Sequence, residues 1–141
     1  VAGWWLCMTL PSGRVMSYPG VGLSVSKETD EDGKVSTNVR IKYQGENQLT
    51  RQWGFQYTYS GKLVENCTQA LCRDLLANAL LNVEDNGYPI VLPVHDEIIC
   101  ETPDLPEYNV AELERLMCEL PEWAEGFPLV AEGQELKRYA K

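Results

Sequence analysis

The sequence predicts an α+β domain in which antiparallel strands pack against one long helix. Strand-like segments occur in both halves of the chain, and residues 61–84 form the longest helical candidate between them. The 141 residues suffice for one domain with its own core, and they contain no internal repeat and no linker. We therefore expect a single domain over residues 1–141.

The N-terminal half predicts two hairpins. Trp4–Thr9 and Val15–Tyr18 are expected strands, joined by a Pro-Ser-Gly turn at 11–13. Leu23–Ser26 and Val35–Tyr43 form the second expected pair, and the residues at its tip are acidic. Such a tip belongs in solvent.

The helix predicted over Gly61–Glu84 contains good helix formers throughout, and Gly87 follows as a stop. One face is apolar at helical spacing, which implies packing against a sheet. The residues of that face are Val64, Cys67, Leu71, Leu75, Leu76, Ala79, Leu80 and Val83.

A second helix is expected to begin at Asn109, because Asn109 and Glu112 have the spacing of a capping box. Pro121 is expected to end it. Phe127–Ala131 is a candidate for a final strand.

Two apolar runs, 90–94 and 98–100, flank His95, Asp96 and Glu97. Runs without alternation are typical of strands buried on both faces, so the three polar residues fall at a hairpin tip. Tight hairpin turns prefer Asn-Gly or Gly-Gly. Adjacent carboxylates at a buried edge repel each other unless a cation is present. A functional role for the tip is therefore expected.

The tip and the helix before it resemble a known family. Residues 59–76 contain Glu-Asn-x-x-Gln, Gly87-Tyr88-Pro89 follows, and then Val94-His95-Asp96-Glu97. Together these motifs resemble the C-terminal palm of family A DNA polymerases, the phage-type branch in particular. Leu-Pro-Ser-Gly-Arg at 10–14 and Tyr-Pro at 18–19 resemble the strand and turn that follow the fingers. Residues 131–133 and 137–139 resemble the C-terminus of the family. The resemblance thus runs nearly end to end and implies a palm-type antiparallel sheet.

Two motifs of that family are missing from the chain. One is the strand with the first catalytic aspartate, and the other is the nucleotide-binding helix of the fingers. We therefore expect this chain to be the last part of a longer polymerase, without fingers or thumb and inactive in isolation.

The resemblance implies roles for the tip. Nucleotidyl transfer uses two Mg²⁺ ions, and carboxylates are natural Mg²⁺ ligands. Asp96 is expected to bind the ions together with the missing upstream aspartate. Glu97 matches the following acid, a metal-site residue that supports through water, and His95 matches a residue near the primer terminus. The alternative is an acidic tip that faces solvent with no such role.

A second candidate site lies on the long helix. Lys62, Asn66, Gln69 and Arg73 fall along a stripe about 60° wide. Amide and guanidinium donors suit the minor groove, where every base pair offers acceptors. By resemblance, Gln69 matches the minor-groove glutamine of the family and Arg73 a neighbouring DNA contact. An ordinary solvated face is the alternative.

Arg14 follows the first turn and resembles a position near the primer strand, although a simple surface residue is equally compatible with the sequence. The expected partners are primer–template DNA, deoxynucleoside triphosphates (dNTPs) and the N-terminal remainder of the polymerase. A net charge of −9 argues against tight DNA binding by this segment alone.

Two other functions remain open. The chain could be a non-catalytic fragment or interaction domain that assembles with a separate N-terminal part of the polymerase. It could also be a small acidic metal-binding module, for which two adjacent carboxylates are a poor cage.

The remaining composition points to the cytoplasm. The five cysteines are scattered and odd in number, which favours free thiols in a reducing compartment. A bacterial host cytoplasm follows if the chain is phage-encoded. No apolar stretch reaches the roughly 18 residues of a membrane span, so no membrane partner is expected.

Overall fold

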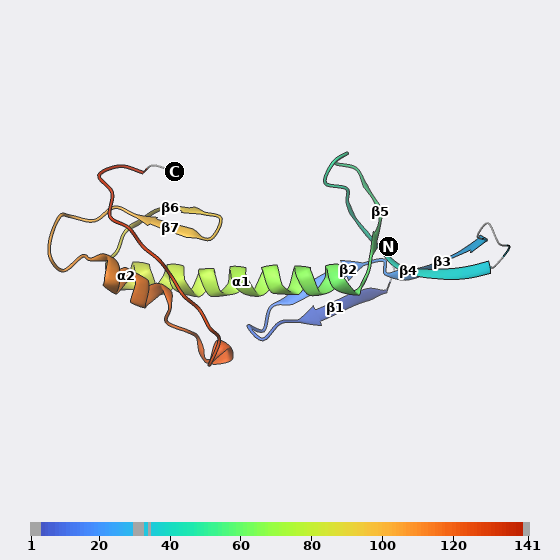
Figure 1. Ribbon diagram of the computed structural model, residues 1–141, viewed down its shortest axis with the longest axis horizontal. Helices are drawn as coiled ribbons and strands as arrows, with labels where there is room; N and C mark the ends of the chain where they lie inside the picture. The colour runs from blue at the N-terminus through green and yellow to red at the C-terminus, as the bar shows by residue number, and fades with distance from the viewer. Residues whose placement is uncertain (1–3, 30–32, 34, 140–141) are drawn as a thin grey trace. The chain divides into compact units, whose positions relative to one another are not determined.

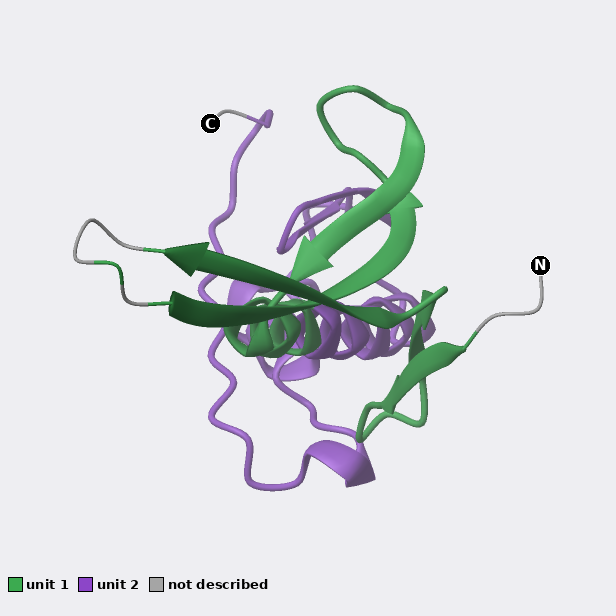
Figure 2. Ribbon diagram, turned by 90° about the vertical axis from the view of Figure 1, so that its right-hand side faces the viewer, with its two compact units in different colours: residues 1–69 green, residues 70–141 purple. Residues whose placement is uncertain are grey.

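The computed structural model describes residues 4–29, 33 and 35–139. The chain divides into two compact units, residues 1–69 and residues 70–141, which Figure 2 shows in different colours. The boundary falls within the long helix α1 (Ser60–Asp85), so the two units share that helix (Figure 1). Each unit is described separately below.

The first unit opens with a hairpin of β1 (Trp5–Thr9) and β2 (Val15–Pro19). Its turn is closed by a backbone hydrogen bond of 2.8 Å from the N–H of Leu10 to the carbonyl of Arg14. Gly13 has a φ of +84°, a conformation that glycine adopts without strain. The predicted first hairpin is confirmed.

A three-stranded antiparallel sheet follows, with β4 (Val35–Glu46) between β3 (Gly22–Thr29) and β5 (Trp53–Thr58). The predicted second hairpin is confirmed as β3 and β4, but residues 30–32 of its acidic tip lie outside the described residues. Residues on one face of that hairpin are apolar and exposed. They include Leu23, Val25 and Val39, which are 67%, 61% and 54% exposed.

Helix α1 confirms the predicted helix within one residue at each end. Gly87 terminates it in the left-handed conformation, with φ +84°. The N–H of Tyr88 then donates to the carbonyl of Val83 over 3.2 Å, which satisfies one of the last carbonyls. Of the predicted apolar face, Leu75 and its neighbours Ala79 and Val83 are buried.

The second unit contains the hairpin of β6 (Ile90–Val94) and β7 (Glu97–Cys100), helix α2 (Val110–Met117) and the short helix η1 (Glu122–Ala124). Its core joins the end of α1 to α2. The buried residues are Val83, Tyr88 and Leu116, with Ile90, Ile98, Cys100, Tyr108, Leu113 and Met117 packed around them.

Helix α2 begins as predicted, because the Asn109 side chain accepts a hydrogen bond of 2.9 Å from the N–H of Glu112. Its end was predicted wrongly. The helix ends at Met117, before Pro121, and Pro121 instead precedes η1. The expected strand over Phe127–Ala131 was also wrong, since that segment has no regular secondary structure.

The α+β class with antiparallel sheets is confirmed. The strands that the structure describes lie in three separate sheets, of two, three and two strands, rather than in one. Strand pairing is decided by contacts distant in sequence, which local patterns do not reveal. Within the described residues, no helix is both long and apolar enough to cross a bilayer.

The hairpin of β6 and β7 is not buried on both faces, contrary to the prediction. Val91 and Leu92 are 60% and 51% exposed. Pro93 lies in β6, where its missing N–H removes one donor from the ladder. The sheet has two strands only, so β6 is an edge strand and tolerates proline.

Candidate active site

The tip of the hairpin of β6 and β7 is a two-residue turn. Val94 and Glu97 form the last pair of the ladder, and His95 and Asp96 connect them. His95, Asp96 and Glu97 are all exposed. The structure therefore keeps the predicted three residues together at one tip.

The backbone of His95 is unusual, because its φ is +54°. Arg51 is the only other non-glycine residue with positive φ among those described. Two-residue hairpin turns place glycine, asparagine or aspartate where φ is positive. A residue with a Cβ in that conformation costs about 1–3 kcal/mol. Strain of this kind at an exposed tip favours a role for the His95 side chain.

The electrostatic argument for the tip was wrong. Repulsion between Asp96 and Glu97 was expected to be strong because both carboxylates were placed at a buried edge. Both are exposed, so water screens them and neither loses its hydration. The strain at His95, not desolvation, is what distinguishes this turn from an ordinary one.

Glu97 has a partner that the sequence did not suggest. The hydroxyl of Tyr139 donates to Glu97 Oε2 over 3.3 Å, across 42 positions of the chain. Residues 137–139 had been noted only as part of the resemblance. Among the described residues, no group of three or more His, Cys, Asp or Glu is arranged to hold a metal ion.

Two of the four side chains in the stripe on α1, those of Lys62 and Asn66, contact other side chains of the protein. Lys62 Nζ lies 2.9 Å from Glu65 Oε1, and this hydrogen bond raises the pKa of Lys62. The half-buried amide of Asn66 donates to the Tyr18 hydroxyl over 3.1 Å. Both residues therefore have partners within the first unit.

Gln69 and Arg73 continue the stripe one and two turns further along α1, and both are exposed. Their spacing of four residues places them on one side of the helix. Arg14 lies elsewhere, exposed directly after the turn between β1 and β2.

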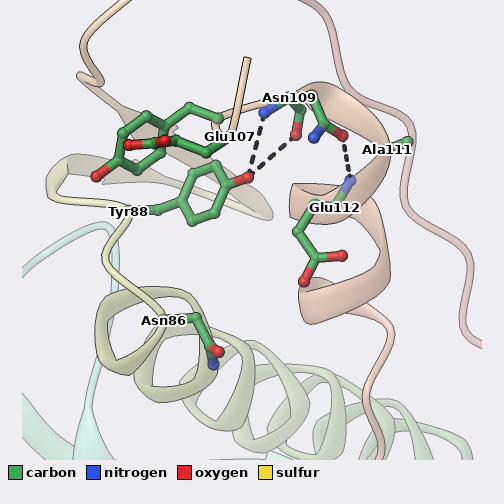
Figure 3. Close-up of a pocket in the computed structure, with 7 residues that line it drawn as sticks. Asn86, Tyr88, Glu107, Asn109, Ala111 and Glu112 are labelled. Carbon is green, nitrogen blue, oxygen red and sulfur yellow. Dashed lines mark hydrogen bonds between the residues drawn. The ribbon is translucent and has the colours of Figure 1, made fainter. Parts of the chain in front are cut away.

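An open pocket in the second unit contains none of the predicted site residues (Figure 3). Its lining comprises Asn86, Tyr88, Glu107, Tyr108, Asn109, Ala111 and Glu112. The Tyr88 hydroxyl accepts from the Asn109 N–H over 3.2 Å and donates to the Asn109 carbonyl over 3.3 Å. These polar groups already have partners and fix the start of α2, so their role is structural.

Comparison with known proteins gives one informative match. The chain is 35% identical over 136 residues to a DNA polymerase of Bacillus phage SP02. The alignment covers 96% of the chain. The resemblance to a phage DNA polymerase is confirmed. No protein-family model and no solved structure matches the chain.

The chain spans about a fifth of the length of the phage polymerase, since the alignment covers 20% of that protein. The match nevertheless extends over nearly all of the residues discussed above. The likeness to the phage polymerase is therefore a property of the whole chain and not of one motif.

Proposed function

We propose that this chain supplies part of the active site of a phage-type family A DNA polymerase, which extends a primer with dNTPs on a DNA template. The observation that carries the proposal is the 35% identity to a phage DNA polymerase along 96% of the chain. The His-Asp-Glu tip adds support, because it is exposed and its first residue is strained. Primer–template DNA, dNTPs and the N-terminal remainder of the polymerase are the partners.

Asp96 and Glu97 are the proposed metal residues of the chain. Carboxylate oxygens are the hard donors that Mg²⁺ prefers, so their chemistry fits this ion. Two adjacent carboxylates do not complete a coordination shell, and the upstream aspartate of the polymerase would supply further oxygens. Bound Mg²⁺ lowers the pKa of a coordinated hydroxyl and neutralises phosphate charge.

The protein residues have distinct proposed tasks. Asp96 would hold the metal, and Glu97 would support the site beside it. The Tyr139 hydroxyl holds one oxygen of Glu97, which limits the orientations of that carboxylate. His95, which has a φ of +54° in the turn, is the proposed neighbour of the primer terminus, by its match to the family.

Gln69 and Arg73 are the proposed minor-groove and strand contacts. Both are exposed, and they lie four residues apart on helix α1. An amide or guanidinium donor can meet purine N3 or pyrimidine O2 without reading the base. Lys62, Asn66 and Arg14 are weaker proposed DNA contacts, since Lys62 and Asn66 already have protein partners.

A second function is favoured by the exposed apolar face on β3 and β4. Leu23, Val25 and Val39 expose more than half of their surface, and exposed apolar patches mark interaction sites. The chain would then be a non-catalytic domain that assembles with a separate N-terminal polymerase part. Sedimentation at increasing concentration tests this second function. The function predicts that the isolated chain associates as its concentration rises, and that the longest native polypeptide containing it does not extend a primer.

Primer extension tests the proposed synthesis directly. The longest native polypeptide that contains this chain is incubated with primer–template DNA, dNTPs and Mg²⁺. We expect extension that stops when EDTA removes the metal and resumes when Mg²⁺ is restored in excess. Extension that continues at full rate in EDTA, or no extension by the folded polypeptide, would reject the proposal.

A further inference from the structure

One face of the three-stranded sheet carries a row of exposed aromatic rings. Along β5, Trp53, Phe55 and Tyr57 are 68%, 53% and 59% exposed. The residues between them, Gly54 and Gln56, are half-buried. Successive side chains of a strand point to opposite faces of a sheet, so the three rings share the more exposed face. We call it the aromatic face.

The neighbouring strand β4 adds polar and cationic side chains to the aromatic face. In the ladder of β4 and β5, Lys42 stands opposite Tyr57, and Gln44 stands opposite Phe55. Lys42 Nζ lies 4.7 Å from the centroid of the Phe55 ring, which is a cation–π contact within this face. Arg40 is exposed and lies two residues before Lys42 on β4, so it belongs to the same face.

The two cations of the aromatic face are available to an anion. Residues 40–44 and 53–57 include no carboxylate. Glu46 follows at the end of β4, where its Oε1 lies 3.4 Å from Arg51 Nη1, so this carboxylate already has a cationic partner. Among the described residues, no carboxylate forms an ion pair with either cation of the face.

Packing within the sheet does not account for the three rings. Aromatic side chains stabilise a sheet when an apolar cross-strand neighbour covers them. Here the residues opposite the rings are Lys42, Gln44 and Glu46, and each ring keeps more than half of its surface exposed. Contiguous large rings on the surface of a protein mark a place where a partner binds.

The distribution of charge agrees with an anionic partner on this unit. Residues 1–69 contain seven Lys or Arg against six Asp or Glu, a formal charge of +1. Residues 70–141 contain five against fifteen, a formal charge of −10. A polyanion would meet little repulsion from the first unit and strong repulsion from the second.

The spacing of the rings suits an unpaired strand of nucleic acid. Side chains two positions apart on a β-strand stand roughly 7 Å apart, whereas the repeat of one strand within duplex DNA is about 3.4 Å along the axis. One base on each ring therefore requires an extended strand rather than a duplex. Aromatic rings beside cationic side chains are typical of surfaces that bind single-stranded nucleic acid.

We propose that the aromatic face binds unpaired DNA. Bases stack on Trp53, Phe55 and Tyr57, and the phosphates between them contact Arg40 and Lys42. Stacking of this kind does not select a sequence, because every base has a π-face. The inference rests on the proposed function, in which the template strand is unpaired ahead of the primer terminus.

Photocrosslinking locates the contact in the longest native polypeptide that contains this chain. A thymidine oligonucleotide in which iododeoxyuridine replaces some thymidines is irradiated with the polypeptide, and the crosslinked tryptic peptides are identified by mass spectrometry. Trypsin cuts after Arg51 and Lys62, so the three rings fall in the peptide 52–62. We expect this peptide to be crosslinked. Crosslinks that all fall outside residues 52–62 would overturn the proposal and leave a protein surface as the partner of this face.

Trp53→Leu tests stacking in the full 141-residue chain, because leucine is apolar but has no π-face. We expect the Kd for the thymidine oligonucleotide to rise about tenfold, with Tm nearly unchanged because the ring is mostly exposed. Trp5→Leu is the matched control, since Trp5 is 60% exposed on β1, in a different sheet. An unchanged Kd for Trp53→Leu, or an equal rise for Trp5→Leu, would contradict stacking on this face.

Arg40→Gln tests the phosphate contact. One lost contact should raise the Kd and reduce the slope of log K against log salt by about 0.7, the value for one phosphate of a single strand. Lys27→Gln is the matched control. Arg40 pairs with Ser24 on β3, and Lys27 is three positions beyond Ser24, so Lys27 lies on the opposite face of the same sheet. Equal effects of the two variants would contradict a contact localised to the aromatic face.

The outcomes separate this surface from the proposed synthesis. If the native polypeptide extends primers and the peptide 52–62 is not crosslinked, the aromatic face fails as a DNA contact and the proposed synthesis stands. If the peptide is crosslinked and the polypeptide cannot extend a primer, the DNA-binding surface stands and the proposed synthesis fails.

Discussion

His95 occupies the first position of the turn between β6 and β7 with a φ of +54°, a conformation that glycine adopts without strain. The residue is exposed, so packing does not explain the choice. A side chain at a strained, exposed position is better explained by its chemistry than by its contribution to folding.

His95→Gly should therefore stabilise the chain. Relief of the strained φ outweighs the extra entropy of glycine in the unfolded state, and we expect the free energy of unfolding to rise by about 1 kcal/mol. Chemical denaturation measures it. His95→Ala is the control, because alanine keeps the Cβ and the strain. A glycine variant less stable than the alanine variant would contradict this explanation.

Some of the residue positions and contacts in the structure could be predicted from the sequence, and others could not. The His-Asp-Glu tip could be predicted because its three residues are adjacent in the chain and flanked by strands. The hydrogen bond between Tyr139 and Glu97 could not, because it joins residues 42 positions apart through a segment without regular secondary structure. The pairing of Asn66 with Tyr18 was missed because the two residues lie 48 positions apart in the chain.

At the scale of elements, the start of α2 shows how local signals succeed and where they stop. The predicted cap is present, since Asn109 Oδ1 accepts from the N–H of Glu112. The carboxylate of Glu112 accepts two bonds from Arg115, of 3.0 and 2.8 Å, so it is engaged along the helix. The Asn109 cap and the Glu112–Arg115 pair are thus separate contributions to one helix.

Asn109→Ala should lower the free energy of unfolding by about 1 kcal/mol, because the N–H of Glu112 loses its acceptor. Thermal or chemical unfolding measures the loss. Asn109→Ser retains an acceptor at the same position and should recover most of it. A serine variant as unstable as the alanine variant would show that the cap does not cause the effect.

The pair of Glu112 and Arg115 predicts a dependence on pH. The hydrogen bond from Arg115 lowers the pKa of Glu112, so the folded state binds fewer protons than the unfolded state near that pKa. The pair stabilises the folded state fully above the ordinary glutamate pKa. This stabilisation is lost as the pH falls through the lowered pKa of Glu112. Arg115→Gln should flatten the part of the stability profile that lies below the ordinary glutamate pKa. An identical profile in both proteins would refute it.

Helices and strands were predicted well where neighbouring residues in the sequence determine them. They were predicted poorly where contacts between distant residues determine them. The long helix was placed within one residue at each end, because its formers and Gly87 lie next to one another in the sequence. The apolar runs on either side of His95 indicated strands correctly, but not their exposure. Phe127–Ala131 has strand-like residues and no partner strand, and apolar character alone does not provide one.

At the scale of the whole molecule, the two units differ in charge. The unit of residues 1–69 is nearly neutral, and the unit of residues 70–141, which contains Asp96, is strongly acidic. An acidic unit suits cations, and a near-neutral unit with local cationic sites tolerates nucleic acid. Most of the net charge of −9 therefore belongs to the second unit.

Single-turnover primer extension by Asp96→Asn tests the central claim, that Asp96 is the metal residue through which this chain takes part in DNA synthesis. The native polypeptide that contains the chain is compared with Asp96→Asn and with Asp104→Asn, which changes an exposed aspartate of the same unit. We expect Asp96→Asn to reduce the incorporation rate about a thousandfold, with folding unchanged. Asp104→Asn should match the unmodified protein. Incorporation by Asp96→Asn within about tenfold of the unmodified rate, a change of about 1.4 kcal/mol, would contradict the claim.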